Sequence, residues 1–171
     1  MILRREAKKF SMKNNRKDTF FARLPEYARL YAIPYALSKQ GLQKYGRQGS
    51  IHQLALQKVN SFDKIKYRNV ITVFIGGSTS IAAIKNGKPI EVSNGFSPIG
   101  GILSETGCGE IDSAIIFQLL ADGVSGGEIE RLLSKQSGFK ALAGGRFRLT
   151  NILGRRNLKE QFAKEVFCYQ I

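Results

Sequence analysis

Cysteine and histidine are scarce in this 171-residue sequence, which holds two cysteines and one histidine. Cys108 and Cys168 are too few for a disulfide framework. Together with the single His52 they cannot assemble a His/Cys zinc site within one chain. The longest apolar stretches, such as residues 81–84 and 114–117, are far too short to cross a bilayer. These absences exclude a disulfide scaffold, an intrachain zinc centre of this kind and a membrane span.

Acidic residues are also few, since 13 Asp and Glu stand against 27 Lys and Arg, for a formal net charge of +14. Residues 1–17 are the most basic part and hold one acidic residue, Glu6, so we expect a solvated tail there. Such charge could attract nucleic acid, an anionic membrane or phosphate ligands. No nucleic-acid readout motif accompanies it, which makes nucleic acid the least favoured partner. No apolar run follows these charges, so we expect a cytoplasmic protein without a secretory signal.

The rest of the composition is typical of one soluble globular domain. Apolar residues make up 43% and charged residues 23% of the chain, which argues against disorder. The sequence contains no internal repeat and no obvious linker. It therefore predicts a basic tail at residues 1–17 and one domain at residues 18–171.

Two prolines and a glycine mark the first predicted helices. Pro25 is expected to open a helical stretch, Pro34 to interrupt or restart it, and Gly41 to end it. A short strand is expected at residues 42–45, followed by a tight loop. A cap at Ser50 should begin a helix that runs to residue 61. Its inner stripe would consist of Ile51, Leu54, Ala55 and Val59.

Three strands are predicted between residues 70 and 93. Residues 70–75 form a continuous β-branched and aromatic run, which is typical of a strand buried on both faces. The run ends in a glycine-rich turn at residues 76–80. Asn86-Gly87 accepts the positive φ angles of a type I′ turn, so a β-hairpin is expected over residues 80–93.

The C-terminal half is predicted to be mainly helical. A long loop of small residues, 94–109, precedes helices at residues 111–120, 125–134 and 158–169. Gly138 lies where a C′ glycine would end the second of these helices. The last helix should place Phe162, Val166 and Tyr169 on one stripe.

The glycine-rich turn is the first candidate for chemistry. Gly76, Gly77, Ser78 and Thr79 offer backbone N–H groups and hydroxyls to a phosphate without bulky side chains in the way. The turn is neither a Walker A sequence nor a G-x-G-x-x-G motif, and hairpins with two glycines are common without a ligand. Both interpretations stay open on these residues alone.

Other polar candidates have a simpler structural or surface interpretation beside the functional one. Asp18 could act as a base or hold a magnesium ion. His52, in the first turn of a predicted helix, could contact an anion. Arg146 and Arg148 follow a glycine pair and could reach a nucleotide. Cys108 has no basic neighbour to activate its thiol.

Taken in order, segments of residues 18–171 resemble the acetate kinase family, with order and spacing kept. The matching segments are residues 18–35, 44–52 (KYGRQGSIH against the family's RYGFHGTSH), 74–80 (FIGGSTS against HLGNGSS), 81–88 (IAAIKNGK against SICAIKNGK), 94–112 and 137–148. The resemblance implies an α/β protein with part of the actin-like ATPase (ribonuclease H-like) fold, in which helices flank a mixed sheet. It also implies phosphorylation of acetate by ATP and Mg²⁺ to acetyl phosphate, while some relatives use propionate or butyrate.

The resemblance assigns roles to individual residues. Asp18 matches the family's essential acidic residue, near magnesium and the transferred phosphoryl group. His52 matches the second histidine of the RYGFHGTSH segment. The implied nucleotide contacts are Gly76, Gly77, Ser78, Thr79 and Arg148, with Arg146 in place of an aspartate.

Several positions depart from the family pattern. Gln48 stands at the catalytic histidine position and Gly107 at the active-site arginine position. Phe74 and Gly77 replace the histidine and asparagine of HLGNG. The catalytic positions are therefore degenerate, because neither Gln48 nor Gly107 carries a positive charge. An arginine that neutralises a transferring phosphoryl group can be worth roughly 10³-fold in rate.

The family's N-terminal phosphate loop and C-terminal adenosine loop do not occur in this sequence, which corresponds to a middle section. A sheet cut this way should leave an open edge and an uncovered apolar face. The implied partners are ATP and a short-chain carboxylate such as acetate, together with a second chain that supplies the missing segments, or a homodimer. The alternative is a catalytically inactive remnant that binds a nucleotide or a protein.

Overall fold

A computed structural model describes residues 19–62, 68–144 and 157–171 of the chain. The chain divides into two compact units. The first contains residues up to Phe74 together with Ser80–Pro98, and the second contains Ile75–Thr79 together with Ile99–Ile171. The basic tail lies outside the described residues, so the division into a tail and one domain at residues 18–171 stays a prediction.

The first unit begins with short helices whose positions follow from its prolines. They are η1 (Phe21–Arg23), α2 (Glu26–Arg29) and α3 (Tyr35–Lys39), followed by the longer α4 (Gly49–Phe62). Pro25 and Pro34 are the N-cap residues of α2 and α3, as predicted. A proline suits this place because it has no N–H for a helix to satisfy.

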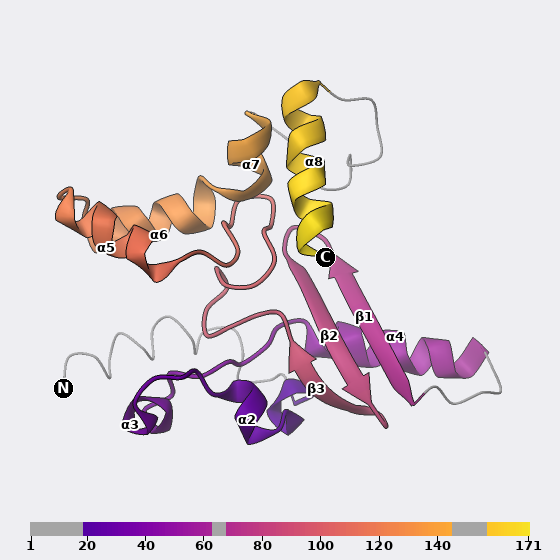
Figure 1. Ribbon diagram of the computed structural model, residues 1–171. Helices are drawn as coiled ribbons and strands as arrows, with labels where there is room; N and C mark the ends of the chain where they lie inside the picture. Colours follow the sequence, from indigo (N-terminus) through magenta and orange to yellow (C-terminus); the bar gives the residue numbers. More distant parts are fainter. Residues whose placement is uncertain (1–18, 63–67, 145–156) are drawn as a thin grey trace. The chain divides into compact units, whose positions relative to one another are not determined.

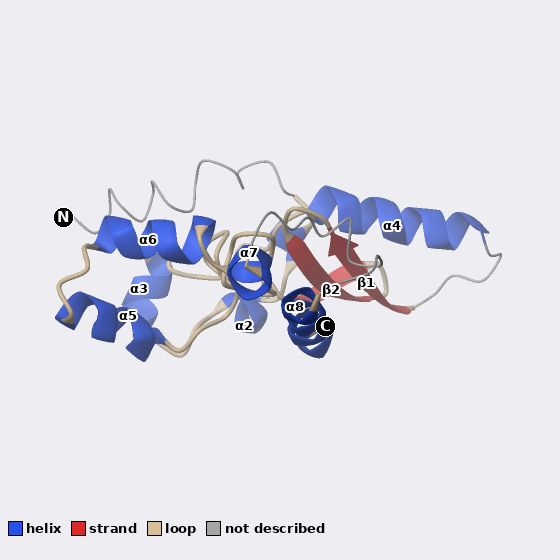
Figure 2. Ribbon diagram, turned by 90° about the horizontal axis from the view of Figure 1, so that it is seen from above, coloured by secondary structure: helices blue, strands red, loops and turns tan. Residues whose placement is uncertain are grey.

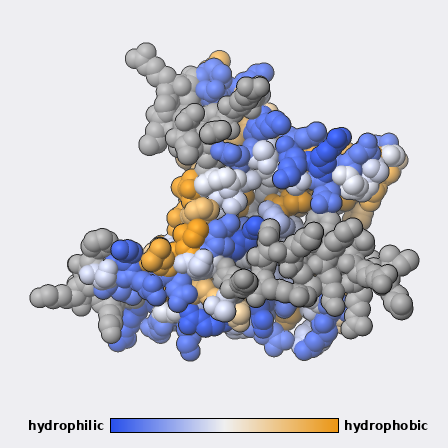
Figure 3. All heavy atoms as spheres, turned by 180° about the vertical axis from the view of Figure 1, so that it is seen from behind, coloured by the Kyte–Doolittle hydropathy of each residue, from blue (hydrophilic) through white to orange (hydrophobic). Residues whose placement is uncertain are grey.

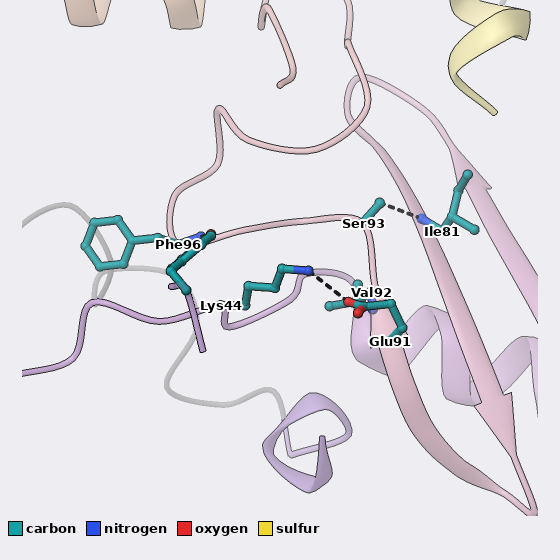
Figure 4. Close-up of polar contacts among 7 residues, drawn as sticks. Lys44, Ile81, Glu91, Val92, Ser93 and Phe96 are labelled. Atoms are coloured by element: carbon teal, nitrogen blue, oxygen red, sulfur yellow. Dashed lines mark hydrogen bonds and ion pairs between the residues drawn. The ribbon is translucent and has the colours of Figure 1, made fainter. Parts of the chain in front are cut away.

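The strand predicted at residues 42–45 is absent from this described segment. The Lys44 N–H donates to the carbonyl of Arg29 at 2.8 Å, and the Tyr45 N–H donates to the carbonyl of Gly95 at 3.2 Å. The Lys44 Nζ also lies 3.0 Å from Glu91 Oε1, as Figure 4 shows. The segment is therefore held by the carbonyls of Arg29 and Gly95 and by an ion pair rather than by a strand ladder, and the strand prediction was wrong.

The described strands form one antiparallel sheet in the order β1-β2-β3 (Figure 1). They are β1 (Asn69–Ile75), β2 (Thr79–Lys85) and β3 (Lys88–Val92). Between β2 and β3, Asn86 has φ 51° and Gly87 has φ 75°, which confirms the predicted hairpin turn. The register of β2 and β3 shifts at a bulge after Ala83.

Helix α4 lies along one face of this sheet (Figures 1 and 2). Its buried side chains among the described residues are His52 and Leu56, one turn apart, next to the buried Gly49, whereas Ile51 and Leu54 are exposed. The predicted inner stripe was therefore wrong. Apolar residues occur on more than one side of α4, and packing against the strands selects the side that carries the histidine.

Strand β1 is an edge strand among the described residues. Its outward side chains Ile71, Val73 and Ile75 are 72%, 44% and 52% exposed, while Thr72 between them is buried. The prediction that this strand is buried on both faces was wrong. Strand β1 instead has an open edge and an exposed apolar face among the described residues, as expected for a middle section of the fold.

The second unit is helical, as predicted. Its helices are α5 (Ser113–Ala121), α6 (Gly126–Lys135), α7 (Gly138–Ala143) and α8 (Leu158–Gln170). Ser125 caps α6 and Asn157 caps α8, each in a capping box with a glutamate three residues later. Such boxes satisfy N–H groups that a helix start leaves open. No helix in the described ranges has both the length and the apolar character that crossing a membrane requires.

The core of the second unit lies between its loop and its last two helices. Its buried residues are Leu103, Phe139, Ala143, Ala163 and Phe167. The rings of Phe139 and Phe167 are 5.1 Å apart. Phe162 and Tyr169 are exposed, so the stripe predicted for α8 was wrong. Figure 3 shows, on one face of the molecule, that apolar residues reach the surface between hydrophilic ones.

Candidate functional site

The turn that joins β1 to β2 is open to solvent at its tip. The Gly76 N–H donates to the Ser78 carbonyl at 3.0 Å, which closes a narrow turn. Gly77 is exposed, and a Cβ added there would meet no heavy atom within 4 Å. An anion can therefore approach the backbone of this turn without a steric barrier.

The four residues assigned to phosphate binding differ in their accessibility. Gly76 and Ser78 are half-buried beside the exposed Gly77. Thr79, which begins β2, is almost completely buried. The accessible part of the candidate site is thus Gly76–Ser78, and the side chain of Thr79 belongs to its base.

His52 holds together the two strands that flank the turn. Its Nδ1 lies 2.7 Å from the Thr72 hydroxyl on β1, and its Nε2 lies 2.8 Å from the Ser80 hydroxyl on β2. A neutral imidazole has one donor and one acceptor nitrogen, and a hydroxyl can serve as either partner. The Phe21 ring packs against the imidazole in a T-shaped arrangement, with centroids 5.6 Å apart.

The burial of His52 bears directly on its predicted role. The side chain is 1% exposed, and both ring nitrogens are engaged within the fold. An anion could reach the imidazole only if one of these contacts opened. The catalytic role implied for His52 stays a prediction, and the contacts themselves are those of a residue that positions the turn.

Gln48, at the family's histidine position, lies at the start of α4. Its backbone has φ 56°, in the left-handed region. Its carbonyl accepts from the N–H groups of Ile51 at 2.9 Å and His52 at 3.0 Å. The helix start thus fixes the Gln48 backbone, and the half-buried side chain offers an amide but no charge.

Arg47 is a candidate that the sequence did not single out. It precedes Gln48 and is half-buried, and this burial lowers the pKa of its guanidinium from the usual value. No carboxylate in the described part of the chain forms a salt bridge with it. The sequence offered one signal that could have identified Arg47, because this basic residue directly precedes Gln48, at the family's histidine position.

Gly107, at the family's arginine position, lies in a closed loop. Its N–H donates to the Ser104 hydroxyl at 2.9 Å, and the Ser104 N–H donates to the Gly107 carbonyl at 3.0 Å. A Cβ at Gly107 would lie 2.8 Å from the Ser104 Oγ. A side chain at this position would require the Ser104 hydroxyl to move.

The remaining site predictions fall on residues that are not described. Asp18, Arg146 and Arg148 all lie outside the described ranges. Within those ranges, no group of three His, Cys, Asp or Glu residues is arranged to hold a metal ion. A magnesium ion bound through one or two carboxylates and substrate phosphates needs no such group.

Cys108 has the properties of a structural thiol. Burial raises the pKa of this thiol, and its Sγ donates to the Gly109 carbonyl at 3.1 Å. A thiol with a raised pKa is mostly protonated at neutral pH and is a poor nucleophile.

The family model of the acetokinase family matches residues 16–171, which is most of the chain. The chain belongs to the acetokinase family. The match includes the turn at Gly76–Ser78, the start of α4 and the closed loop at Gly107. The resemblance drawn from the sequence is therefore confirmed.

Relatives of this acetokinase-family chain are considerably longer than it. An acetate kinase of Thermosynechococcus vestitus is 35% identical over 157 residues, which are 89% of this chain and 38% of the relative. The acetate kinase structure of Porphyromonas gingivalis matches with a TM-score of 0.81 at 30% identity, over 90% of this chain and 40% of that one. A propionate kinase structure from Francisella tularensis gives a TM-score of 0.83 at 30% identity, over 90% and 41%.

The comparisons confirm the fold class and its partial character. The chain spans about 40% of the length of the curated relatives that it matches, and the matched part is a middle section. Its elements are thus part of the α/β actin-like ATPase fold.

Proposed function

We propose that this chain is part of an acetate kinase-type phosphotransferase that moves a phosphoryl group from ATP to a short-chain carboxylate such as acetate. The observation that carries the proposal is the accessible turn Gly76–Ser78, fixed at its base by His52, in a chain of the acetokinase family. The relatives include acetate kinases and a propionate kinase, which supports this substrate class. We also propose a cytoplasmic location.

The turn fits the phosphates of ATP. Its open tip at Gly77 leaves room for phosphate oxygens beside backbone N–H groups, and Ser78 adds a hydroxyl. Arg146 and Arg148 are assigned to the nucleotide and Asp18 to a magnesium ion. Magnesium, when bound, neutralises charge on the transferring phosphates.

The site has fewer positively charged side chains than phosphoryl transfer usually requires. The reaction depends on positive charge placed around the equatorial oxygens of the transferred group. Gln48 supplies only an amide, and Gly107 supplies no side chain at all.

The second candidate is a remnant that binds a nucleotide or a protein without catalysis. The substitutions at Gln48 and Gly107 favour it, because the scaffold around both is intact while the charged groups are gone. A nucleotide-binding remnant would share ATP binding at the turn with the first function and would lack its turnover, whereas a protein-binding remnant would lack both.

A Gly77→Asp variant is expected to weaken binding of magnesium-ATP at least about tenfold, or about 1.4 kcal/mol, because a carboxylate would face the phosphates. Isothermal titration calorimetry gives the affinity. Gly127→Asp is the matched control, since Gly127 is also open on its side-chain side and lies in the first turn of α6. Equal affinities for the two variants would remove the turn from the site.

Hydroxylamine trapping of acetyl phosphate measures whether the chain catalyses transfer. We expect little product from ATP and acetate with the purified chain alone, since cationic groups are missing. An Asp18→Asn variant provides the background. Robust turnover that this variant abolishes would eliminate the remnant. A chain that neither turns over nor binds magnesium-ATP would contradict the phosphotransferase and the nucleotide-binding remnant, and would leave only a protein-binding remnant.

A further inference from the structure

The turn between β2 and β3 is flanked by a pair of lysines. Lys85 ends β2, Lys88 begins β3, and the Cα atoms of the two residues are direct partners across the strands. Both residues are exposed. Like charges at directly opposite positions of two strands repel each other and destabilise the pairing. A bound anion would relieve this repulsion.

Two arginines from other segments lie at the same turn. The Arg68 carbonyl accepts from the Asn86 N–H at 2.6 Å. The Arg23 Nη2 donates to the Gly87 carbonyl at 3.4 Å, and this guanidinium lies 5.2 Å from the centre of the buried Phe20 ring. Both arginines are exposed. We call Arg23, Arg68, Lys85 and Lys88 the hairpin cation cluster.

The hairpin cation cluster forms no salt bridge within the described part of the chain. The salt bridge found in those ranges joins Lys44 to Glu91 instead. Four neighbouring cations without a carboxylate create a positive potential that attracts anions. All four residues are exposed, whereas a site for a small molecule buries most of its ligand. The cluster therefore suits an extended polyanion that lies across the surface.

The residues of the turn narrow the class of polyanion. Residues 85–88 include no aromatic side chain on which a base of a single strand could stack. They also include no apolar side chain that could enter a bilayer or form the centre of a protein interface. Exposed lysines and arginines are the groups that contact the phosphates of a duplex. Such contacts need no base-reading motif, and the sequence contains none.

We propose that the hairpin cation cluster binds the phosphate backbone of a nucleic-acid duplex without reading its bases. This activity is separate from the proposed phosphoryl transfer. The turn Gly76–Ser78 precedes the first residue of β2, whereas Lys85 is its last residue. The net charge of +14 attracts the duplex from a distance, and the cluster provides the contacts.

Fluorescence anisotropy with labelled double-stranded DNA of mixed sequence tests the proposal. The full chain is titrated at several salt concentrations between about 50 mM and about 200 mM, and the affinity should fall as salt rises because each phosphate contact releases a counterion. The double variant Lys85→Gln/Lys88→Gln should bind at least about tenfold more weakly at the lowest salt. Its slope of log K against log salt should be smaller by about 1.8, or about 0.9 for each lost contact.

The matched control is the double variant Lys135→Gln/Lys140→Gln. Both of these lysines are exposed in the second unit, and their replacement lowers the net charge by the same amount. The affinity should change by less than about threefold, because salt screens attraction without contact. Arg68→Gln should reduce the slope by about 0.9, and its bond to Asn86 persists because it uses the backbone carbonyl. Unchanged far-UV circular dichroism shows that the variants are folded.

The inference is overturned by an absence of binding at the lowest salt, by equal losses in the two double variants, or by tighter binding of a single strand than of the duplex. Phosphatidylserine vesicles that displace the duplex more effectively than unlabelled duplex would assign the cluster to a membrane surface. Magnesium-ATP affinity should be unchanged in Lys85→Gln/Lys88→Gln. A loss of that affinity would place these lysines in the nucleotide site and contradict the separate activity.

Discussion

Replacement of His52 by alanine is expected to lower the free energy of unfolding by roughly 3–5 kcal/mol. The imidazole bridges the hydroxyls of Thr72 and Ser80. Its removal leaves two buried hydroxyls without that partner and a cavity beside Phe21. Each unsatisfied buried group costs about 1–3 kcal/mol, and the cavity adds its own cost. Urea unfolding followed by circular dichroism measures the difference.

The matched control for this prediction is Leu54→Ala on the same helix. Leu54 is exposed, and its truncation should change stability by less than about 1 kcal/mol. Because Ser80 lies only two residues after Ser78, the hydrogen exchange of Gly77 and Ser78 should also accelerate in the His52→Ala variant alone. If the two variants unfolded at the same urea concentration, His52 would not be the link between α4 and the strands.

Replacement of Gly138 by alanine is expected to destabilise the second unit by about 3 kcal/mol or more. Gly138 has φ +66°, where a side chain is strained. A Cβ there would also collide with the Ser104 carbonyl oxygen and lie 2.7 Å from the Gly107 carbonyl oxygen. Both atoms are backbone, so neither can move aside as a flexible side chain would.

The exchange of two amides tests the Gly138 prediction locally. The Phe139 N–H donates to the Ser104 carbonyl at 3.0 Å, and the Lys140 N–H donates to the Glu105 carbonyl at 2.9 Å. Both should lose protection in Gly138→Ala. Gly126→Ala, at an open position in the first turn of α6, should be neutral or slightly stabilising. Retained protection at both amides would show that the loop accommodates the methyl group.

Short-range chemistry made the boundaries of many elements predictable. Asn86-Gly87 specifies a tight hairpin because both residues adopt positive φ. Pro25 and Pro34 begin helices because they lack an N–H, and Ser125 begins α6 because its hydroxyl satisfies a helix amide. Each signal acts over a few residues, so no knowledge of the rest of the fold is needed.

The orientation of the elements was not predictable in the same way. On α4 the expected stripe included Leu54, yet the covered side carries His52 and Leu56; on α8 Phe162 is exposed while Ala163 is buried. Apolar residues occupy more than one side of these helices. Which side is covered depends on the partner element, and that partner comes from a distant part of the chain.

The candidate site also contains features that the sequence predicted and features that it did not. The turn at Gly76–Ser78 was recognisable from its small residues, and the family resemblance was recognisable from the order of its motifs. The two partners of His52 lie 20 and 28 residues away. The position expected for Gly138, at the C′ of a helix, was wrong, because the residue begins α7 and passes close to the loop carbonyls.

The amino-acid sequence by itself determined the family, the β1–β2 turn, the hairpin and the starts of α2, α3 and α6, because these depend on backbone preferences and hydrogen bonds between near neighbours. Only the tertiary structure decided that His52 lies between Thr72 and Ser80 and that β1 leaves an apolar face exposed. Burial is a property of what packs against a residue, and the partners that pack between β1 and α4 are 20 or more residues apart in sequence.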